Sequence, residues 1–127
     1  MKESELSLQG LCYQWAYNTY PAVRGVLHHI PNGGKRTKQE AAQLKASGVV
    51  KGVLDLFLPM VRRGYVGLYI EMKLPGEKLR PEQLDFASKV VSNGYVVYRC
   101  DSFDGFRKVL EWYLGIIDIE PINLKVI

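Results

Sequence analysis

Apolar side chains in the first part of the chain recur every three or four residues, which is the period of a helix with one buried face. Residues 3–21 follow this pattern, and Pro21 at their end cannot continue a helix. Residues 37–48 form a second, shorter candidate, because Thr37 and Glu40 have the spacing of a capping box and a glycine closes the segment. The pattern therefore predicts two helices before the first long apolar run.

Two apolar runs rich in β-forming residues follow, at 49–59 and 65–74, with a short glycine-containing turn between them. They predict an antiparallel hairpin. A third such run, 95–100, comes directly after a helical segment and is therefore expected to pair in parallel with an earlier strand. Helical spacing predicts two further helices around that run, at 80–94 and 102–115.

This order of elements predicts an α/β fold in which helices flank a mixed central sheet. The 127 residues suit a single domain, 1–127, and a content of 47% hydrophobic and 24% charged residues is ordinary for a soluble protein. No apolar run approaches the roughly 20 residues of a membrane helix, and the acidic, polar start does not predict a signal peptide. Cys12 and Cys100 lie far apart, so we expect reduced, structural cysteines in a cytoplasmic protein.

The second strand of the hairpin ends on two charged residues, and candidate chemistry begins there. Side chains alternate between the two faces of a strand, so Leu68, Ile70 and Met72 share one face while Glu71 and Lys73 share the other. The charged pair is therefore either ordinary solvated surface or half of a metal site.

A divalent ion that activates water needs two or three carboxylates from rigid elements. Asp55 lies between two leucines in the predicted first strand of the hairpin, and antiparallel pairing can bring it close to Glu71. Glu5 in the first helix offers a third carboxylate, with Gln9 one turn later on the same face. Lys73 could orient the attacking water and offset charge on a pentacovalent phosphate. With Asp55 included, the metal site and the solvated surface are about equally supported.

The net charge of +4 and the isoelectric point near 9.1 are weak evidence for a polyanionic partner, and composition alone slightly favours solubilising charge instead. His28 and His29 are adjacent and point in different directions, so packing or polar contacts near the loop are expected rather than a zinc site. No phosphate-binding glycine motif of the Walker or G-x-G-x-x-G type is present.

Five motifs occur in order along most of the chain. They are the pair Glu5 and Gln9, the loop HHIPNGGKR, the stretch AAQLKASGVVKGVLDL, the strand end YIEMK followed by Gln83 in PEQ, and the run NGYVVYR. In this order they resemble the VRR-NUC family of virus-type replication-repair nucleases, within the PD-(D/E)xK nuclease superfamily. The family usually has proline before the acidic residue, where this chain has Leu54, and that departure concerns the aim of Asp55 rather than metal binding.

The resemblance implies a restriction-endonuclease-like core and a phosphodiesterase that uses Mg²⁺ or Mn²⁺. The implied metal ligands are Glu5, Asp55, Glu71 and the backbone carbonyl of Met72. Lys73 would be the catalytic lysine, and Gln83 would help to position lysine, water or phosphate. The residues that would approach nucleic acid are Asn32, Gly33, Lys35, Arg36 and Lys38.

Small, stand-alone members of the family resemble phage enzymes that act on branched DNA. The resemblance therefore implies a structure-specific endonuclease such as a Holliday (four-way) junction resolvase, in the cytoplasm of a bacterial host if phage-encoded. A flap or single-strand nuclease with the same site, and a catalytically silent branched-DNA-binding module, remain alternatives. Two opposed cuts in a junction favour a symmetric homodimer. The apolar tail 116–127 needs a surface to cover, either the chain's own core or a partner's.

Overall fold

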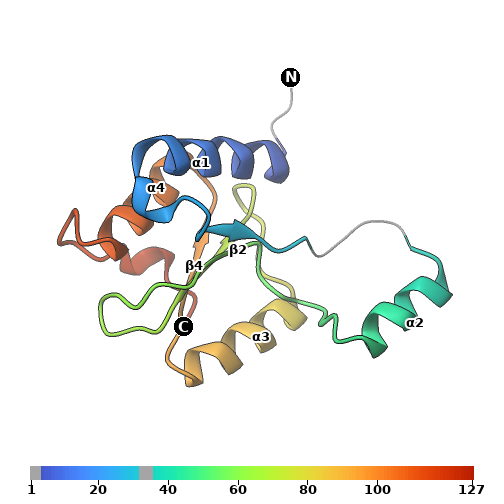
Figure 1. The fold of residues 1–127 in the computed structure, drawn as a ribbon. Helices are drawn as coiled ribbons and strands as arrows, with labels where there is room; N and C mark the ends of the chain where they lie inside the picture. Colours follow the sequence, from blue (N-terminus) through green and yellow to red (C-terminus); the bar gives the residue numbers. More distant parts are fainter. Residues whose placement is uncertain (1–3, 32–35) are drawn as a thin grey trace.

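The computed structural model describes residues 4–31 and 36–127, and within them a four-stranded sheet runs in the order β1-β2-β3-β4 (Figure 1). β1 and β2 pair antiparallel, as do β2 and β3, whereas β3 and β4 pair in parallel. The predicted hairpin and the predicted parallel strand are therefore confirmed, and the two-residue strand β1 was not expected. The strands are β1 (His28–His29), β2 (Leu56–Leu58), β3 (Leu68–Met72) and β4 (Val96–Cys100).

The helices begin and end close to their predicted limits. Side chains of Ser4, Thr37 and Ser102 accept hydrogen bonds from first-turn N–H groups, which are otherwise unsatisfied at the start of a helix. Gly94 follows the third helix at φ 94°, a conformation that glycine adopts without a Cβ clash. The helices are α1 (Glu5–Thr19), α2 (Lys38–Ala46), α3 (Pro81–Ser92) and α4 (Phe103–Tyr113), with short 3₁₀ turns η1 (Pro21–Val23) and η2 (Ile122–Leu124).

Helices cover both faces of the sheet (Figure 1). Leu68, Ile70 and Met72 of β3 are fully buried in the main core, which also contains residues of α1 and α4. On the opposite face, Val97 of β4 packs with Ala87 of α3 in a smaller cluster. The alternation predicted for β3 is therefore confirmed. No helix among the described residues is long and apolar enough to cross a membrane.

The predicted first strand of the hairpin is much shorter than residues 49–59, and Asp55 lies just before β2 rather than inside it. Gly52 has φ 93°, which interrupts an extended strand. The backbone N–H of Asp55 donates to the side chain of Glu71 at 3.0 Å instead of to a neighbouring strand. The placement of Asp55 in a strand was therefore wrong, because tertiary contacts replace the ladder there.

The apolar tail folds partly onto its own sheet. The N–H of Val126 donates to the carbonyl of Val97 at 2.9 Å, and Lys125 forms an isolated bridge with Tyr98. Ile119 and Ile122 nevertheless remain 82% and 68% exposed. The alternative of the chain's own core is thus confirmed for Ile117, Leu124 and Val126, which pack against the two core clusters.

Candidate active site

A cavity of about 220 Å³ lies between the start of α1, the start of α3 and the end of β3. Its lining includes the two members of the first motif, Glu5 and Gln9, and four further residues that the family resemblance singled out: Asp55, Glu71, Lys73 and Gln83. Glu71 and Lys73 are only 2% and 6% exposed. The alternative of ordinary solvated surface was therefore wrong for this pair, because α3 and the loop before it cover that end of the sheet.

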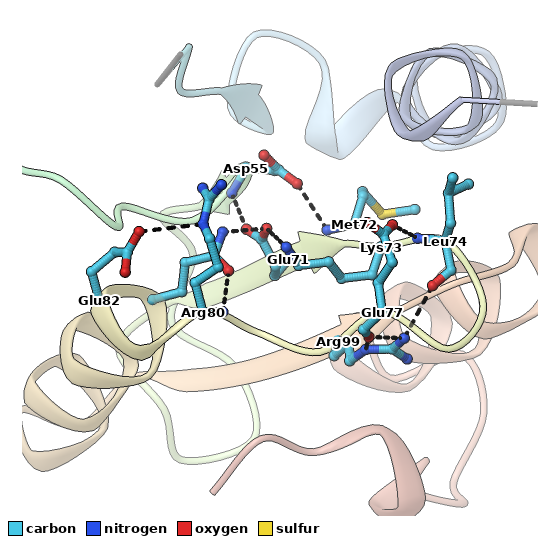
Figure 2. A network of polar contacts seen from close by, with 10 residues as sticks. Asp55, Glu71, Met72, Lys73, Leu74, Glu77, Arg80, Glu82 and Arg99 are labelled. Carbon is cyan, nitrogen blue, oxygen red and sulfur yellow. Dashed lines mark hydrogen bonds and ion pairs between the residues drawn. The ribbon is translucent and has the colours of Figure 1, made fainter.

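The Asp55 and Glu71 carboxylates are linked by two hydrogen bonds, in which each side chain accepts from a backbone N–H on the other's segment (Figure 2). Glu71 Oε1 accepts from the backbone N–H of Asp55 at 3.0 Å, and Asp55 Oδ2 accepts from the backbone N–H of Met72 at 2.9 Å. Each carboxylate thus satisfies a backbone donor on the other's segment. This arrangement fixes both side chains relative to β3.

Gln83 and Lys73 approach the second oxygen of Glu71. Gln83 Nε2 donates to Glu71 Oε2 at 2.8 Å, and Lys73 Nζ lies 3.6 Å from the same atom. Gln83 Oε1 accepts from the backbone N–H of Arg80 at 2.8 Å, so the amide also closes the first turn of α3. The backbone N–H of Lys73 donates to Cys100 at 2.9 Å, which extends the pairing of β3 with β4. Lys73 is therefore carried on a rigid backbone.

His29 also lines this cavity, which the sequence did not indicate. Its Nδ1 lies 2.9 Å from the carbonyl oxygen of Asp55, and the next backbone N–H, of Ile30, donates to that same oxygen at 2.8 Å. His28 instead bonds through Nδ1 to the carbonyl of Val26 and meets the ring of Phe57 edge-on. The expectation of packing and polar contacts is confirmed, and two-residue pairing with β2 is what brings His29 to the site.

The carboxylates of the cavity share an unfavourable charge environment. Burial raises the pKa of Glu71 to about 7, with a further rise from the Asp55 carboxylate, while Lys73 opposes both. Burial also raises the pKa of Asp55. The hydrogen bond from the Met72 N–H and the nearby His29 and Lys73 side chains partly lower it again. The pKa of half-buried Glu5 is raised by burial and by Glu77. Three carboxylates thus face two cationic side chains, Lys73 and Arg80, in the described lining of the cavity.

The donor set fits Mg²⁺ or Mn²⁺ in kind, because the candidate ligands are carboxylate oxygens and the three carboxylates outnumber the cations Lys73 and Arg80 in the described lining. Asp55 and Glu71 are already adjacent, and Glu5 lines the same cavity. As they stand, no three His, Cys, Asp or Glu side chains in the described part of the chain are grouped closely enough to hold an ion. Metal ligation by Asp55, Glu71, Glu5 and the Met72 carbonyl therefore stays a prediction.

The predicted nucleic-acid loop does not reach this cavity in the residues that can be placed. Asn32, Gly33 and Lys35 lie outside the described residues. Arg36 and Lys38 are exposed, and Arg36 lines a different and larger cavity beside α2. Arg80, which the sequence analysis missed, lines both cavities. Only its place next to the helix-starting Pro81 could have drawn attention to it.

Comparisons with known proteins agree with the motif pattern. The family model described as "VRR-NUC domain" matches residues 4–104. A solved structure titled "VRR_NUC domain protein" superimposes with a TM-score of 0.78 over 92% of this chain and 93% of that one, at 24% sequence identity. At that identity the structural match shows the fold alone. No curated protein matches.

Proposed function

Because this chain belongs to the VRR-NUC domain family, which implies a nuclease, we propose that it is a divalent-metal-dependent endonuclease acting on branched DNA. One observation carries the proposal. Asp55, Glu71 and Lys73 meet in a single cavity, with the lysine Nζ 3.6 Å from Glu71 Oε2. Binding DNA needs no buried carboxylates beside phosphate, whereas metal-assisted hydrolysis does.

In this proposal Asp55, Glu71 and Glu5 hold Mg²⁺ or Mn²⁺, and the Met72 carbonyl adds a ligand. When bound, such an ion lowers the pKa of a water molecule and polarises a phosphoryl oxygen. The hydrogen bonds from the Asp55 and Met72 N–H groups orient the two central carboxylates before any ion arrives. Preorganisation of this kind reduces the rearrangement needed during reaction.

Lys73 and Gln83 act on the reacting groups. The Lys73 ammonium is buried, so its attraction for a developing negative charge is less screened than at the surface. It is suited to orienting the attacking water and offsetting charge on the pentacovalent phosphate. Gln83 ties Glu71 to the first turn of α3 through Glu71 Oε2, the same oxygen that lies 3.6 Å from the lysine Nζ.

The finer part of the proposal is a four-way junction as substrate and a symmetric homodimer as the active form. Resolving a junction requires two opposed cuts, and a two-fold dimer supplies two sites with matching symmetry. Ile119 and Ile122 are 82% and 68% exposed, which offers apolar surface for a partner. Arg36 and Lys38 supply positive charge toward the DNA backbone.

A substrate panel tests this proposal. The purified protein is mixed with labelled four-way junction, flap, duplex and single-stranded DNA, with Mg²⁺, Mn²⁺ or a chelator. We expect metal-dependent, symmetric nicks in the junction, and no nicks from Asp55→Asn at the same protein concentration. Cleavage confined to flaps or single strands would replace the junction substrate, and binding without cleavage in any metal would overturn the nuclease. Light scattering should give about twice 14.4 kDa, and a monomer on junction DNA would overturn the resolvase.

A further inference from the structure

A larger cavity of about 1040 Å³ lies between α2, the segment after it and the start of α3, and we refer to it as the α2 groove. Figure 1 shows α2 set apart from the sheet, on the side where α1 and α3 begin. The carboxylate cavity is lined by residues from the starts of both helices. No residue of α2 is buried, so this helix contributes little to the core. The charged residues described in the groove lining are Arg36, Lys45, Lys51, Arg80 and Glu82.

One wall of the α2 groove is formed by a segment whose backbone packs closely against α3. Gly52 lies against the first turn of α3, and a Cβ added to it would come within 2.3 Å of the carbonyl oxygen of Glu82. Its φ of 93° also disfavours other residues. The connection from α2 to β2 therefore has a defined position against α3, and it forms a wall of the groove without filling it.

Arg80 is the charged residue that joins the α2 groove to the carboxylate cavity. Its side chain lines both, and its backbone N–H donates to Gln83 Oε1 at 2.8 Å. Its guanidinium Nε lies 3.3 Å from Glu82, in an ion pair whose Arg80 side chain is 62% exposed. Water and salt screen such an exposed pair, so it contributes little to stability. The guanidinium can therefore exchange this carboxylate for a phosphate at little cost.

We propose that the α2 groove receives the DNA backbone on one side of the scissile phosphate, and that Arg80 binds the phosphate at the step into the carboxylate cavity. This inference rests on the proposed function, since it assumes a nucleic-acid substrate. Four cationic side chains and one carboxylate in the described lining give the complementary charge for a phosphate chain. Contacts of this kind set the position of the DNA and read no bases.

The test compares Arg80→Ala with Lys89→Ala, which removes one charge from the far end of the same helix. Lys89 lines neither cavity and pairs with exposed Asp85 at 2.9 Å. Both variants keep the backbone hydrogen bond of residue 80 to Gln83, and circular dichroism checks their folding. Binding to labelled junction DNA is measured by fluorescence anisotropy with Ca²⁺ in place of Mg²⁺, over a series of KCl concentrations.

We expect Arg80→Ala to lose roughly three- to tenfold in affinity and to reduce the slope of log K against log salt by about 1. Lys89→Ala should bind as the wild type does, and Arg80→Lys should regain the salt slope because it restores the charge. The double variant Lys45→Glu, Lys51→Glu should weaken binding more than Arg80→Ala does. It tests the groove at residues that lie outside α3. Wild-type affinity and slope in Arg80→Ala, or an equal loss in Lys89→Ala, would overturn the inference.

The same experiment separates failure of the groove from failure of the nuclease. A wild-type protein that cleaves junction DNA while all groove variants bind and cleave normally would overturn the groove alone. A wild-type protein that binds through Arg80 yet cleaves in no metal would support the groove and overturn the nuclease. A protein that binds no DNA at all would overturn both.

Discussion

The carboxylate cavity and the α2 groove are adjacent, share Arg80, and are built in opposite ways. In the cavity, Glu71, Lys73 and Gln83 are almost fully buried, and Glu71 forms a hydrogen bond with Gln83 and an ion pair with Lys73. In the groove, the cations sit on a helix without a buried residue or on exposed turns. The difference separates two tasks, positioning a reacting phosphate and holding a polyanion.

The physical reason is the dielectric environment. A charge in a buried cavity acts strongly on its neighbours but must be positioned and compensated, since its own desolvation is costly. A surface cation is screened by water and salt, so its individual effect is small and several are needed. Single substitutions should therefore have large effects in the cavity and small, additive ones in the groove.

The largest expected effect is on cleavage in Lys73→Ala. Loss of one preorganised group that stabilises transition-state charge costs about 100- to 1000-fold in rate. DNA affinity in Ca²⁺ should stay within about twofold of wild type, because ground-state contacts remain. Single-turnover cleavage of junction DNA, with anisotropy alongside and Lys89→Ala as control, measures both. A wild-type cleavage rate would reduce Lys73 to an ion-pair partner of Glu71.

The next effect concerns pH. The pKa of Glu71 is raised from 4.5 to about 7, so between these values the folded state keeps a proton that the unfolded chain has released. In the metal-free protein, the free energy of unfolding should therefore fall as the pH rises from about 4.5 through 7, by up to roughly 3 kcal/mol. Urea unfolding in chelator at several pH values measures this fall.

Glu71→Gln provides the control, because an amide has no proton to lose in this range. The variant should show a flatter dependence of unfolding free energy on pH. Added Mg²⁺ should stabilise the wild type more at pH 8 than at pH 5, since the ion binds ionised carboxylates. An unchanged pH dependence in Glu71→Gln would show that this carboxyl is not the titrating group.

A smaller effect is expected where the two regions meet, at Gly52. Gly52→Ala places a Cβ against Glu82 and forces a positive φ, so we expect a loss of about 2–3 kcal/mol in unfolding free energy. Gly48→Ala is a matched control, with φ 107° but no atom within 4 Å of the added Cβ. It should lose about 1 kcal/mol from backbone strain alone. Urea unfolding in chelator measures both variants. Equal losses of unfolding free energy in Gly52→Ala and Gly48→Ala would mean that the backbone of α3 shifts to accommodate the added Cβ at little cost.

The smallest effect is expected in the α2 groove itself. Lys45→Ala should weaken binding by about two- to threefold in low salt and leave cleavage at saturating DNA unchanged. Lys108→Ala on α4, whose side chain pairs with Asp104, provides a charge-matched control away from the groove. A Lys45→Ala protein that loses as much activity as Lys73→Ala would remove the distinction between the two regions.

Local rules along the sequence determined the helices, the hairpin and the alternating faces of β3. The cap at Thr37, the proline at the first position of α3 and the period of apolar residues depend only on near neighbours, and these predictions hold in the fold. The order of the motifs was enough to indicate the family, and the candidates Glu5, Asp55, Glu71, Lys73 and Gln83 line one cavity. Sequence spacing predicts which helix or strand carries each of these side chains, but not the distances between side chains on different elements.

Tertiary structure decided burial, protonation and the limits of β2. Glu71 is buried because α3 and its preceding loop close over the sheet, and that long-range contact raises its pKa. Asp55 lies outside the strand because its N–H meets a side chain sixteen residues away along the chain. His29 and Arg80 reach the cavity through strand pairing and helix placement, which depend on contacts between segments far apart along the chain. Desolvation and charge coupling depend on distances in space, so they exist only once the fold has formed.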